Sequence, residues 1–182
     1  YVCGPTVQSS PHVGHLRSTI IGDCFTRVLR AQGHTVIPQN HIGDWGRQFG
    51  MLVEEILDEQ LDASALDLAG AEALYQRANA RLKSSEEFAD RARERVVKLQ
   101  AGDAETRRIW QQLIDVSLAG FNATYARMNV LLTDADLAGE SIYNADLPVV
   151  AADLDDAAIA VVDDGALVVF VDGSTTPAII RH

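Results

Sequence analysis

The chain has 182 residues, and its composition excludes several classes of protein. Its hydrophobic fraction of 47% and its long patterned segments favour a folded globular protein over a disordered one. No uncharged apolar run reaches the roughly 18 residues of a membrane span, so we expect no membrane partner. The formal net charge of −11 repels nucleic acid at long range, so any contact with RNA needs a local basic patch or further segments.

The cysteine content and the chain ends bear on the kind of protein. Two cysteines, Cys3 and Cys24, are too few for a disulfide framework, so we expect a reducing, cytoplasmic environment. The sequence starts at Tyr1 without an initiator Met, inside an expected strand, and stops at His182 just after an apolar run. We therefore expect it to be part of a larger fold.

The first 40 residues follow the order strand, loop, helix, strand. We expect a short strand over residues 1–3, a helix over about 13–32 and a second strand over 34–37. Gly33 is a typical stop signal for the helix. This order predicts a β-α-β unit with a parallel sheet, and hence a protein of the α/β class.

The middle of the chain is predicted to be helical. After a loop over 40–46, a helix is expected over about 48–59. The stretch 71–128 has strong helical spacing and is divided by a break at 101–103. A helix from residue 104 to about 128 follows this break.

The last 40 residues predict a small antiparallel element. A short helix is expected over 151–154, and two apolar runs over 158–162 and 166–171 flank an Asp-Asp-Gly turn. An Asp-Gly pair between apolar runs is typical of a β-hairpin. Residues 177–180 are a candidate third strand.

Residues 9–15, Ser-Ser-Pro-His-Val-Gly-His, are the most informative segment. The start of a helix has unpaired N–H groups and a partial positive charge, which attract phosphate. Gly14 lacks a Cβ and permits close approach of an adenine or ribose. His12 and His15 share a helix face if the helix includes both, and two imidazole donors could stabilise charge on an α-phosphate. A metal pair, or capping and surface roles, are the alternatives.

Longer matches in chain order point to a family. The run over 12–23, His-Val-Gly-His-Leu-Arg-Ser-Thr-Ile-Ile-Gly-Asp, closely resembles the signature of class I aminoacyl-tRNA synthetases in its arginine-specific version. The resemblance continues through the blocks 39–50, 96–103, 131–134, 139–144 and 164–167. It implies the first half of a Rossmann-like nucleotide-binding fold over 1–53, and a largely helical continuation and connective insertion with a β-hairpin over 54–182.

The resemblance also implies roles for single residues. His12, Gly14 and His15 would bind ATP, and the two histidines would be catalytic because they stabilise the adenylation transition state. Ser9 and Ser10 would line the floor between ATP and the amino acid. Five substrate-binding residues would form the mouth or wall of the site: Asn40, His41, Asp44, Trp45 and Gln48. Structural roles are an equal alternative for this group, with Trp45 in the core and Asn40 and Asp44 capping the next helix. No metal ligand is expected.

Two features depart from the arginine-specific pattern. Pro11 abuts His12 where that family has a longer loop, and the first seven residues look like the start of cysteine-specific synthetases. The matching cysteine there binds zinc, but a zinc site needs about four ligands, so a buried free thiol is expected for Cys3. The family also uses a Lys-Met-Ser-Lys-Ser-type loop, and the two lysines, Lys83 and Lys98, lie in no such loop.

The resemblance implies a parent enzyme that activates L-arginine with ATP and Mg²⁺ and attaches it to tRNA in the cytoplasm. Its tRNA contacts would lie mostly in segments outside this chain, which we expect to be inactive alone. Two alternatives stay open. One is a stand-alone relative that activates an amino acid for a non-tRNA acceptor, and the other is a non-catalytic nucleotide-binding module.

Overall fold

The computed structural model describes residues 2–7, 11–174 and 176–181. The chain forms two compact units, Tyr1–Ser141 and Ile142–His182. We predicted a boundary at residue 53 between a nucleotide-binding part and its insertion. This boundary stays a prediction. No helix among the described residues is long and apolar enough to cross a membrane.

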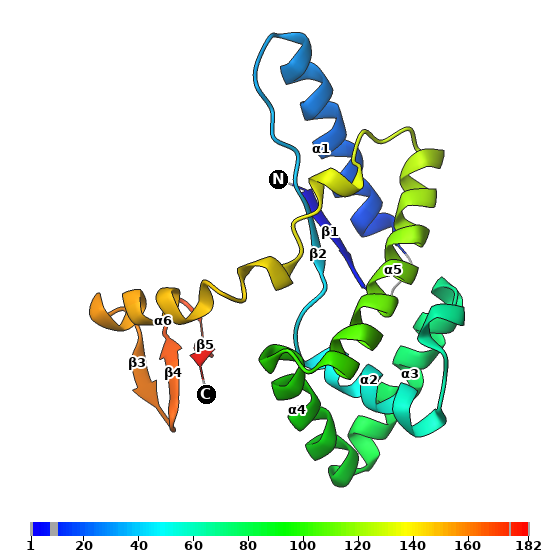
Figure 1. Ribbon diagram of the computed structural model, residues 1–182. Helices are drawn as coiled ribbons and strands as arrows, with labels where there is room; N and C mark the ends of the chain where they lie inside the picture. The colour runs from blue at the N-terminus through cyan, green and yellow to red at the C-terminus, as the bar shows by residue number, and fades with distance from the viewer. Residues whose placement is uncertain (1, 8–10, 175, 182) are drawn as a thin grey trace. The chain divides into compact units, whose positions relative to one another are not determined.

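A parallel strand pair opens the first unit (Figure 1). Strand β1 (Val2–Thr6) pairs with β2 (Asn40–Gly43), and helix α1 (Val13–Ala31) connects them and lies against β1. The predicted β-α-β order is therefore confirmed. Because the strands are parallel, their carboxyl ends lie at one edge of the sheet, and the segments leading to α1 and α2 (Arg47–Glu59) leave from that edge.

The second strand lies later in the chain than predicted, and the prediction of a strand over 34–37 is wrong. Residues 34–39 have no regular structure, whereas 40–43, expected in a loop, form β2. Ile37 is 84% exposed, but Asn40 and Ile42 are almost fully buried. Apolar composition favoured the earlier segment, but pairing with β1 and burial of alternate residues decide which segment becomes the strand.

The first strand is also longer than predicted. The expected loop at Gly4 and Pro5 lies inside β1, where the register of pairing with β2 shifts between Cys3 and Thr6. The two residues that typically break a strand therefore produce an irregularity within it.

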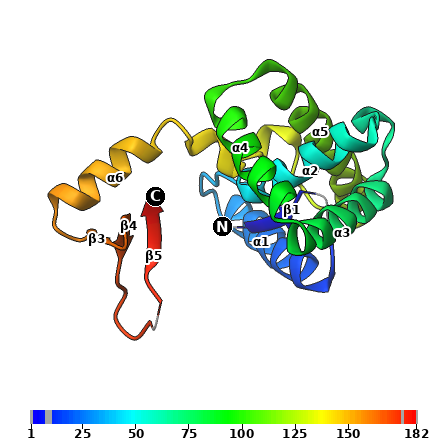
Figure 2. The ribbon, with the colours of Figure 1, turned by 90° about the horizontal axis from the view of Figure 1, so that it is seen from below.

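Four helices form most of the first unit (Figure 2). After α2 and the short 3₁₀ turn η1 (Ala63–Ala65) come α3 (Leu68–Ser84), α4 (Glu86–Ala101) and α5 (Ala104–Arg127), and each of the four contacts the others. The predicted break is confirmed. Gly102 ends α4 with φ +88°, and the Asp103 carboxylate accepts the Thr106 N–H at 2.9 Å to start α5.

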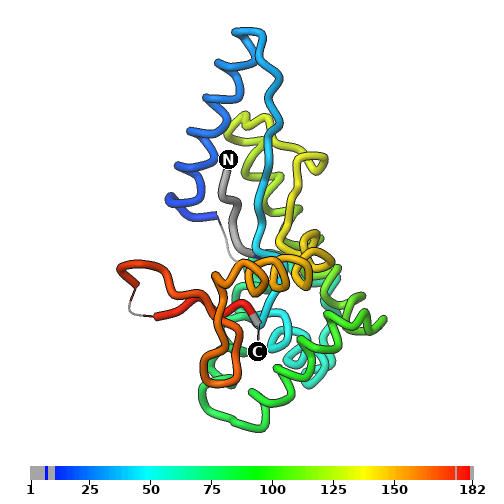
Figure 3. Tube along the Cα trace, turned by 90° about the vertical axis from the view of Figure 1, so that its left-hand side faces the viewer, coloured from blue at the N-terminus to red at the C-terminus, as the bar shows by residue number. Residues whose placement is uncertain are grey.

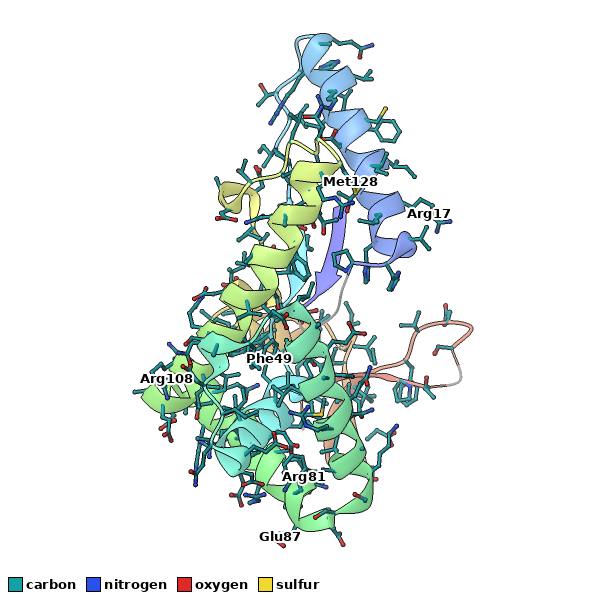
Figure 4. The ribbon with its side chains drawn as sticks, turned by 90° about the vertical axis from the view of Figure 1, so that its right-hand side faces the viewer. Arg17, Phe49, Arg81, Glu87, Arg108 and Met128 are labelled. Carbon is teal, nitrogen blue, oxygen red and sulfur yellow. The ribbon has the colours of Figure 1, made fainter. Side chains whose placement is uncertain are left out.

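Helix α2 supplies the centre of the main core. Phe49, Leu52 and Val53 have essentially no exposed surface, and Phe49 is labelled among the helices in Figure 4. Gly50 brings α4 close, because a Cβ at this position would lie 2.1 Å from the Ala92 carbonyl oxygen. This close approach fixes how α2 and α4 cross.

Ion pairs join α2 to α3 and α4. Carboxylates of α2 face guanidinium groups of the other two helices: Glu54, Glu55 and Asp58 pair with Arg81, Arg91 and Arg95. We call these six residues the α2 ion-pair network. The Glu55 side chain is 1% exposed and lies 2.5 Å from Arg81, which is labelled in Figure 4. A buried carboxylate is costly unless paired, so the arginines hold the three helices together.

The second unit is a helix with a three-stranded antiparallel sheet (orange to red in Figure 3). Helix α6 (Leu147–Asp156) precedes β3 (Val161–Asp163), β4 (Ala166–Val169) and β5 (Ala178–Arg181), which pair in that order. The hairpin and the third strand are confirmed. Asp164 and Gly165 have φ values of +47° and +81°, as a two-residue turn between twisted strands requires.

Candidate functional site

The start of α1 is built around the imidazole of His12. This residue is the N-cap of the helix, and its Nδ1 accepts the Gly14 N–H at 3.1 Å. A Cβ at position 14 would lie 2.9 Å from the His12 ring. Gly14 therefore allows the ring to fold back over the first turn, whereas its predicted role of admitting an adenine or ribose stays a prediction.

This hydrogen bond sets the tautomer of His12. Since Nδ1 accepts, the proton of the neutral ring is on Nε2. The side chain is exposed, so the Nε2–H can donate to a ligand outside the helix. The start of the helix thus presents a side-chain donor in addition to its own N–H groups.

His15 stacks on His12. The ring centroids are 3.8 Å apart at an interplanar angle of 26°. Partial burial and, to a smaller extent, the neighbouring His12 lower the pKa of His15 below 6.5, so the ring is neutral near pH 7. Its Nδ1 is buried and has no hydrogen-bond partner in the described part of the chain. A buried polar atom of this kind calls for a partner such as a ligand or water.

The helix start is held rigidly below the two rings. The His15 carbonyl accepts hydrogen bonds from Ser18 Oγ and Thr19 Oγ1, both at 2.9 Å. Thr19 is 1% exposed and lies on the inner face of α1. The backbone that carries the histidine pair is therefore fixed by the body of α1.

A second group of predicted residues lies on β2 and at the beginning of α2. Asn40 and Asp44 are buried, and His41, Trp45 and Gln48 are half-buried. The Tyr125 hydroxyl of α5 lies 3.4 Å from Asn40 Oδ1, and the Asn40 carbonyl accepts the Ala138 N–H at 3.0 Å. The amide of Gln48 turns back to donate to the Trp45 carbonyl at 2.9 Å.

Asp44 joins three distant segments. Its carboxylate accepts hydrogen bonds from the Ser141 N–H at 2.9 Å and the Ser141 hydroxyl at 2.6 Å. Its backbone carbonyl accepts from Trp110 Nε1 of α5 at 2.7 Å. At Gly139, a Cβ would lie 2.3 Å from the same carboxylate. Asp44 therefore fixes the segment that leads into η3 (Glu140–Tyr143) against the start of α2.

These contacts correct the predicted capping roles. The N-cap of α2 is Gly46, and no side chain caps it. Asn40 lies within β2 and Asp44 binds Ser141, so neither caps the following helix. Trp45 packs partly against the main core, with its ring 5.6 Å from that of Trp110 in an edge-to-face arrangement.

The sequence interpretation missed several residues of this group. Ser141, Gly139 and Trp110 were not chosen, although 139–144 is one of the resembling blocks. Glu140 was missed as well, and burial, with the nearby Asp44, raises the pKa of its carboxyl group. The only available signal was that block, because nothing local pairs residue 44 with residue 141.

Some predicted positions cannot be compared with the structure. Ser9, Ser10 and the side chain of Cys3 lie outside the described residues. Cys24 is an exposed free thiol on α1. Within the described residues, no three His, Cys, Asp or Glu side chains gather as metal ligands.

The chain matches a family model over residues 2–182, described as the catalytic domain of class I tRNA synthetases of the arginine (R) type. The chain belongs to this family. The match covers nearly its whole length, so the family includes the helices and the small sheet as well as the β-α-β unit. The class I synthetase catalytic fold is thereby shown.

The individual relatives that the chain matches are named as members of the same family. Arginine–tRNA ligases of Cutibacterium acnes and Thermobifida fusca are 63% and 52% identical, each over 97% of this chain. The crystal structure of arginyl-tRNA synthetase from Plasmodium falciparum superposes with a TM-score of 0.74 at 28% identity, covering 97% of this chain and 30% of that one. The chain spans about a third of the length of these relatives, 32% for both bacterial ligases.

Proposed function

We propose that this chain is the N-terminal part of the catalytic domain of an arginine–tRNA ligase. Its parent protein would activate L-arginine with ATP and transfer the arginyl group to tRNA. The observation that carries the proposal is the stacked His12–His15 pair at the start of α1, in a chain of the arginine-type family. Two imidazoles at a helix start suit the binding of negatively charged phosphates.

We propose that this pair binds ATP and stabilises the charge that develops on its α-phosphate. His12 would donate from Nε2, because Gly14 occupies Nδ1. His15 is neutral near pH 7, and binding of the nucleotide would satisfy its buried Nδ1 directly or through water. Preorganised donors of this type typically contribute about 2.7–4 kcal/mol each to transition-state stabilisation. Ser9 and Ser10 remain proposed as the floor of the site, and Mg²⁺ as the ion that arrives with ATP.

The residues of β2 and α2 would take two different parts in substrate binding. Asn40 and Asp44 use their side chains to bond other parts of the protein, which favours positioning roles. His41, Trp45 and Gln48 are only half-buried, and we propose that they form the wall next to arginine. We also propose that the parent protein is cytoplasmic and binds tRNA. This chain alone would be inactive.

ATP–pyrophosphate exchange by the full-length protein tests this function. With tRNA present, we expect exchange that depends on arginine and is absent with cysteine, the amino acid that the first seven residues point to. Exchange that depends on cysteine, or on no amino acid, would contradict the proposal. Arginine-dependent exchange without transfer of arginine to tRNA would instead favour a relative that uses another acceptor.

A further inference from the structure

A basic cavity lies between α2, α3 and α4, apart from the histidine pair. Its volume is about 280 Å³. Three cationic side chains line it, Arg47, Lys83 and Arg93, together with Asn79 and three small or aliphatic residues: Leu82, Ala89 and Ala92. None of these lining residues is acidic or aromatic.

The close crossing of α2 and α4 brings the cations together. Gly50 lies directly against the Ala92 carbonyl, so Arg47, one turn before Gly50, comes near Arg93, the neighbour of Ala92. Lys83 adds a third positive charge from the last turn of α3. Arg47 is the first residue of α2, so the partial positive charge of the helix start adds to its own.

The cations of this cavity are less neutralised than other arginines of the same helices. Carboxylates of the α2 ion-pair network neutralise three other arginines: Arg81, Arg91 and Arg95. By contrast, Arg47 and Lys83 have no ion pair or hydrogen bond to another described side chain, and Arg93 pairs with the exposed Asp90 of its own helix. In a chain of net charge −11, such a concentration of positive charge marks a binding place for an anion.

We propose that this cavity binds a backbone phosphate of RNA, at the acceptor end of the tRNA. The inference rests on the proposed function. The segment between β2 and Arg47 is only three residues long, so the cavity lies close to the sheet edge from which the histidine pair also projects. A free nucleotide would need a surface on which its base can stack, and the lining offers none. A phosphodiester needs only the charges.

The test is the binding of tRNA to full-length protein, measured by fluorescence anisotropy over a range of salt concentrations. The triple variant Arg47→Gln, Lys83→Gln, Arg93→Gln removes the cations of the cavity. The matched control Lys98→Gln, Arg107→Gln, Arg108→Gln removes one exposed lysine and two exposed arginines elsewhere, for the same change in net charge. Circular dichroism checks that both variants are folded.

We expect the triple variant to bind tRNA roughly tenfold or more weakly at about 0.1 M salt, and its log–log salt slope to fall by about 0.7–0.9, the contribution of one phosphate contact. The control variant should keep the wild-type slope to within about 0.3. Asp90→Asn releases Arg93 and should tighten binding, which a misfolded protein would not show.

Three results would overturn the inference: an unchanged slope in the triple variant, an equal loss in the control, or a raised KM for ATP with tRNA affinity unchanged. The last would assign the cavity to the phosphates of the nucleotide. Because binding is measured directly, a wild-type protein that binds tRNA but does not charge it with arginine would contradict the proposed function and leave this inference standing.

Discussion

At the scale of single residues, the pairing of His12 with His15 follows from local geometry. The sequence predicted that the two lie on one face if the helix includes both. His12 is instead the N-cap, and the hydrogen bond of its Nδ1 to the Gly14 N–H places its ring against that of His15. The role of Asp44 could not be predicted in this way. Its partner Ser141 is 97 residues away, and only the folded chain brings the two together. Contacts of this kind have no local signature in one sequence.

The lowered pKa of His15 predicts a definite titration. Burial is the larger cause and His12 the smaller, so His15 should titrate below 6.5, and His12→Asn should raise the value only in part. Following the His15 NMR signal over a range of pH, in the wild type and in His12→Asn, measures both pKa values. Titration of His15 at or above 6.5 would contradict the structure.

The same shift has a consequence for stability. Because the folded-state pKa is lower than the unfolded value, the unfolded chain binds more protons between the two values. The free energy of unfolding should therefore be unaffected well above pH 6.5 and should fall as the pH drops through this window. His15→Asn should remove that part of the pH dependence in urea titrations, and His34→Asn should not.

At the scale of elements, the break between α4 and α5 was predicted because its glycine and its capping residue are local signals, but the division between α3 and α4 at Ser85 was missed. The second strand was misplaced because residues 34–37 have strand-like composition, whereas pairing with β1 and burial select 40–43. The turn at Asp164 and Gly165 was predictable, since only a few residue pairs favour two successive positive φ values. Local chemistry thus specified the turns and helices, and tertiary packing decided the parallel strand.

The crossing of α2 and α4 predicts a large effect of one methyl group. Gly50→Ala places a Cβ 2.1 Å from the Ala92 carbonyl oxygen, so the helices must separate. We expect a loss of about 1–3 kcal/mol or more in the free energy of unfolding. Gly120→Ala is the control, because the one tight contact of its Cβ, 2.8 Å, would be with Cδ2 at the end of the Leu68 side chain, which can move. Equal losses in both variants, measured by urea unfolding, would contradict this account.

The α2 ion-pair network predicts that the free energy of unfolding decreases in acid. Hydrogen bonds from Arg91 and then Arg81 hold the pKa of Asp58 well below 3.8. A depressed carboxyl pKa contributes stability that is present above the unfolded value and is lost as the pH falls through the window below it. Asp58→Asn should cost about 1–2 kcal/mol near pH 7, a range that allows for partial solvent screening, and this cost should shrink progressively as the pH falls below 3.8. A cost that does not change with pH would contradict the role of this pairing.

At the scale of the whole molecule, one face of α1 stays apolar and exposed in the described structure. Ile21 and Phe25 of α1 are 50% and 63% exposed, and they line one cavity with Ile37 of the segment that follows the helix, which is 84% exposed. Contiguous apolar surface of this kind promotes association. The 182-residue chain alone should therefore self-associate in sedimentation experiments, and Phe25→Asn with Ile37→Asn should reduce association without destabilising the main core. A monomeric wild-type chain at the same concentration would contradict this prediction.

We propose that the stacked histidines at the start of α1 stabilise the charge on the α-phosphate while ATP activates arginine. This proposal is tested most directly by the rate of arginine-dependent ATP–pyrophosphate exchange in the full-length protein with His12→Asn, His15→Asn or, as a control, the exposed Arg108→Gln. We predict that each histidine variant loses about 10²–10³-fold in rate and that the control keeps the wild-type rate. Histidine variants that stay within about twofold of the wild type would contradict the account.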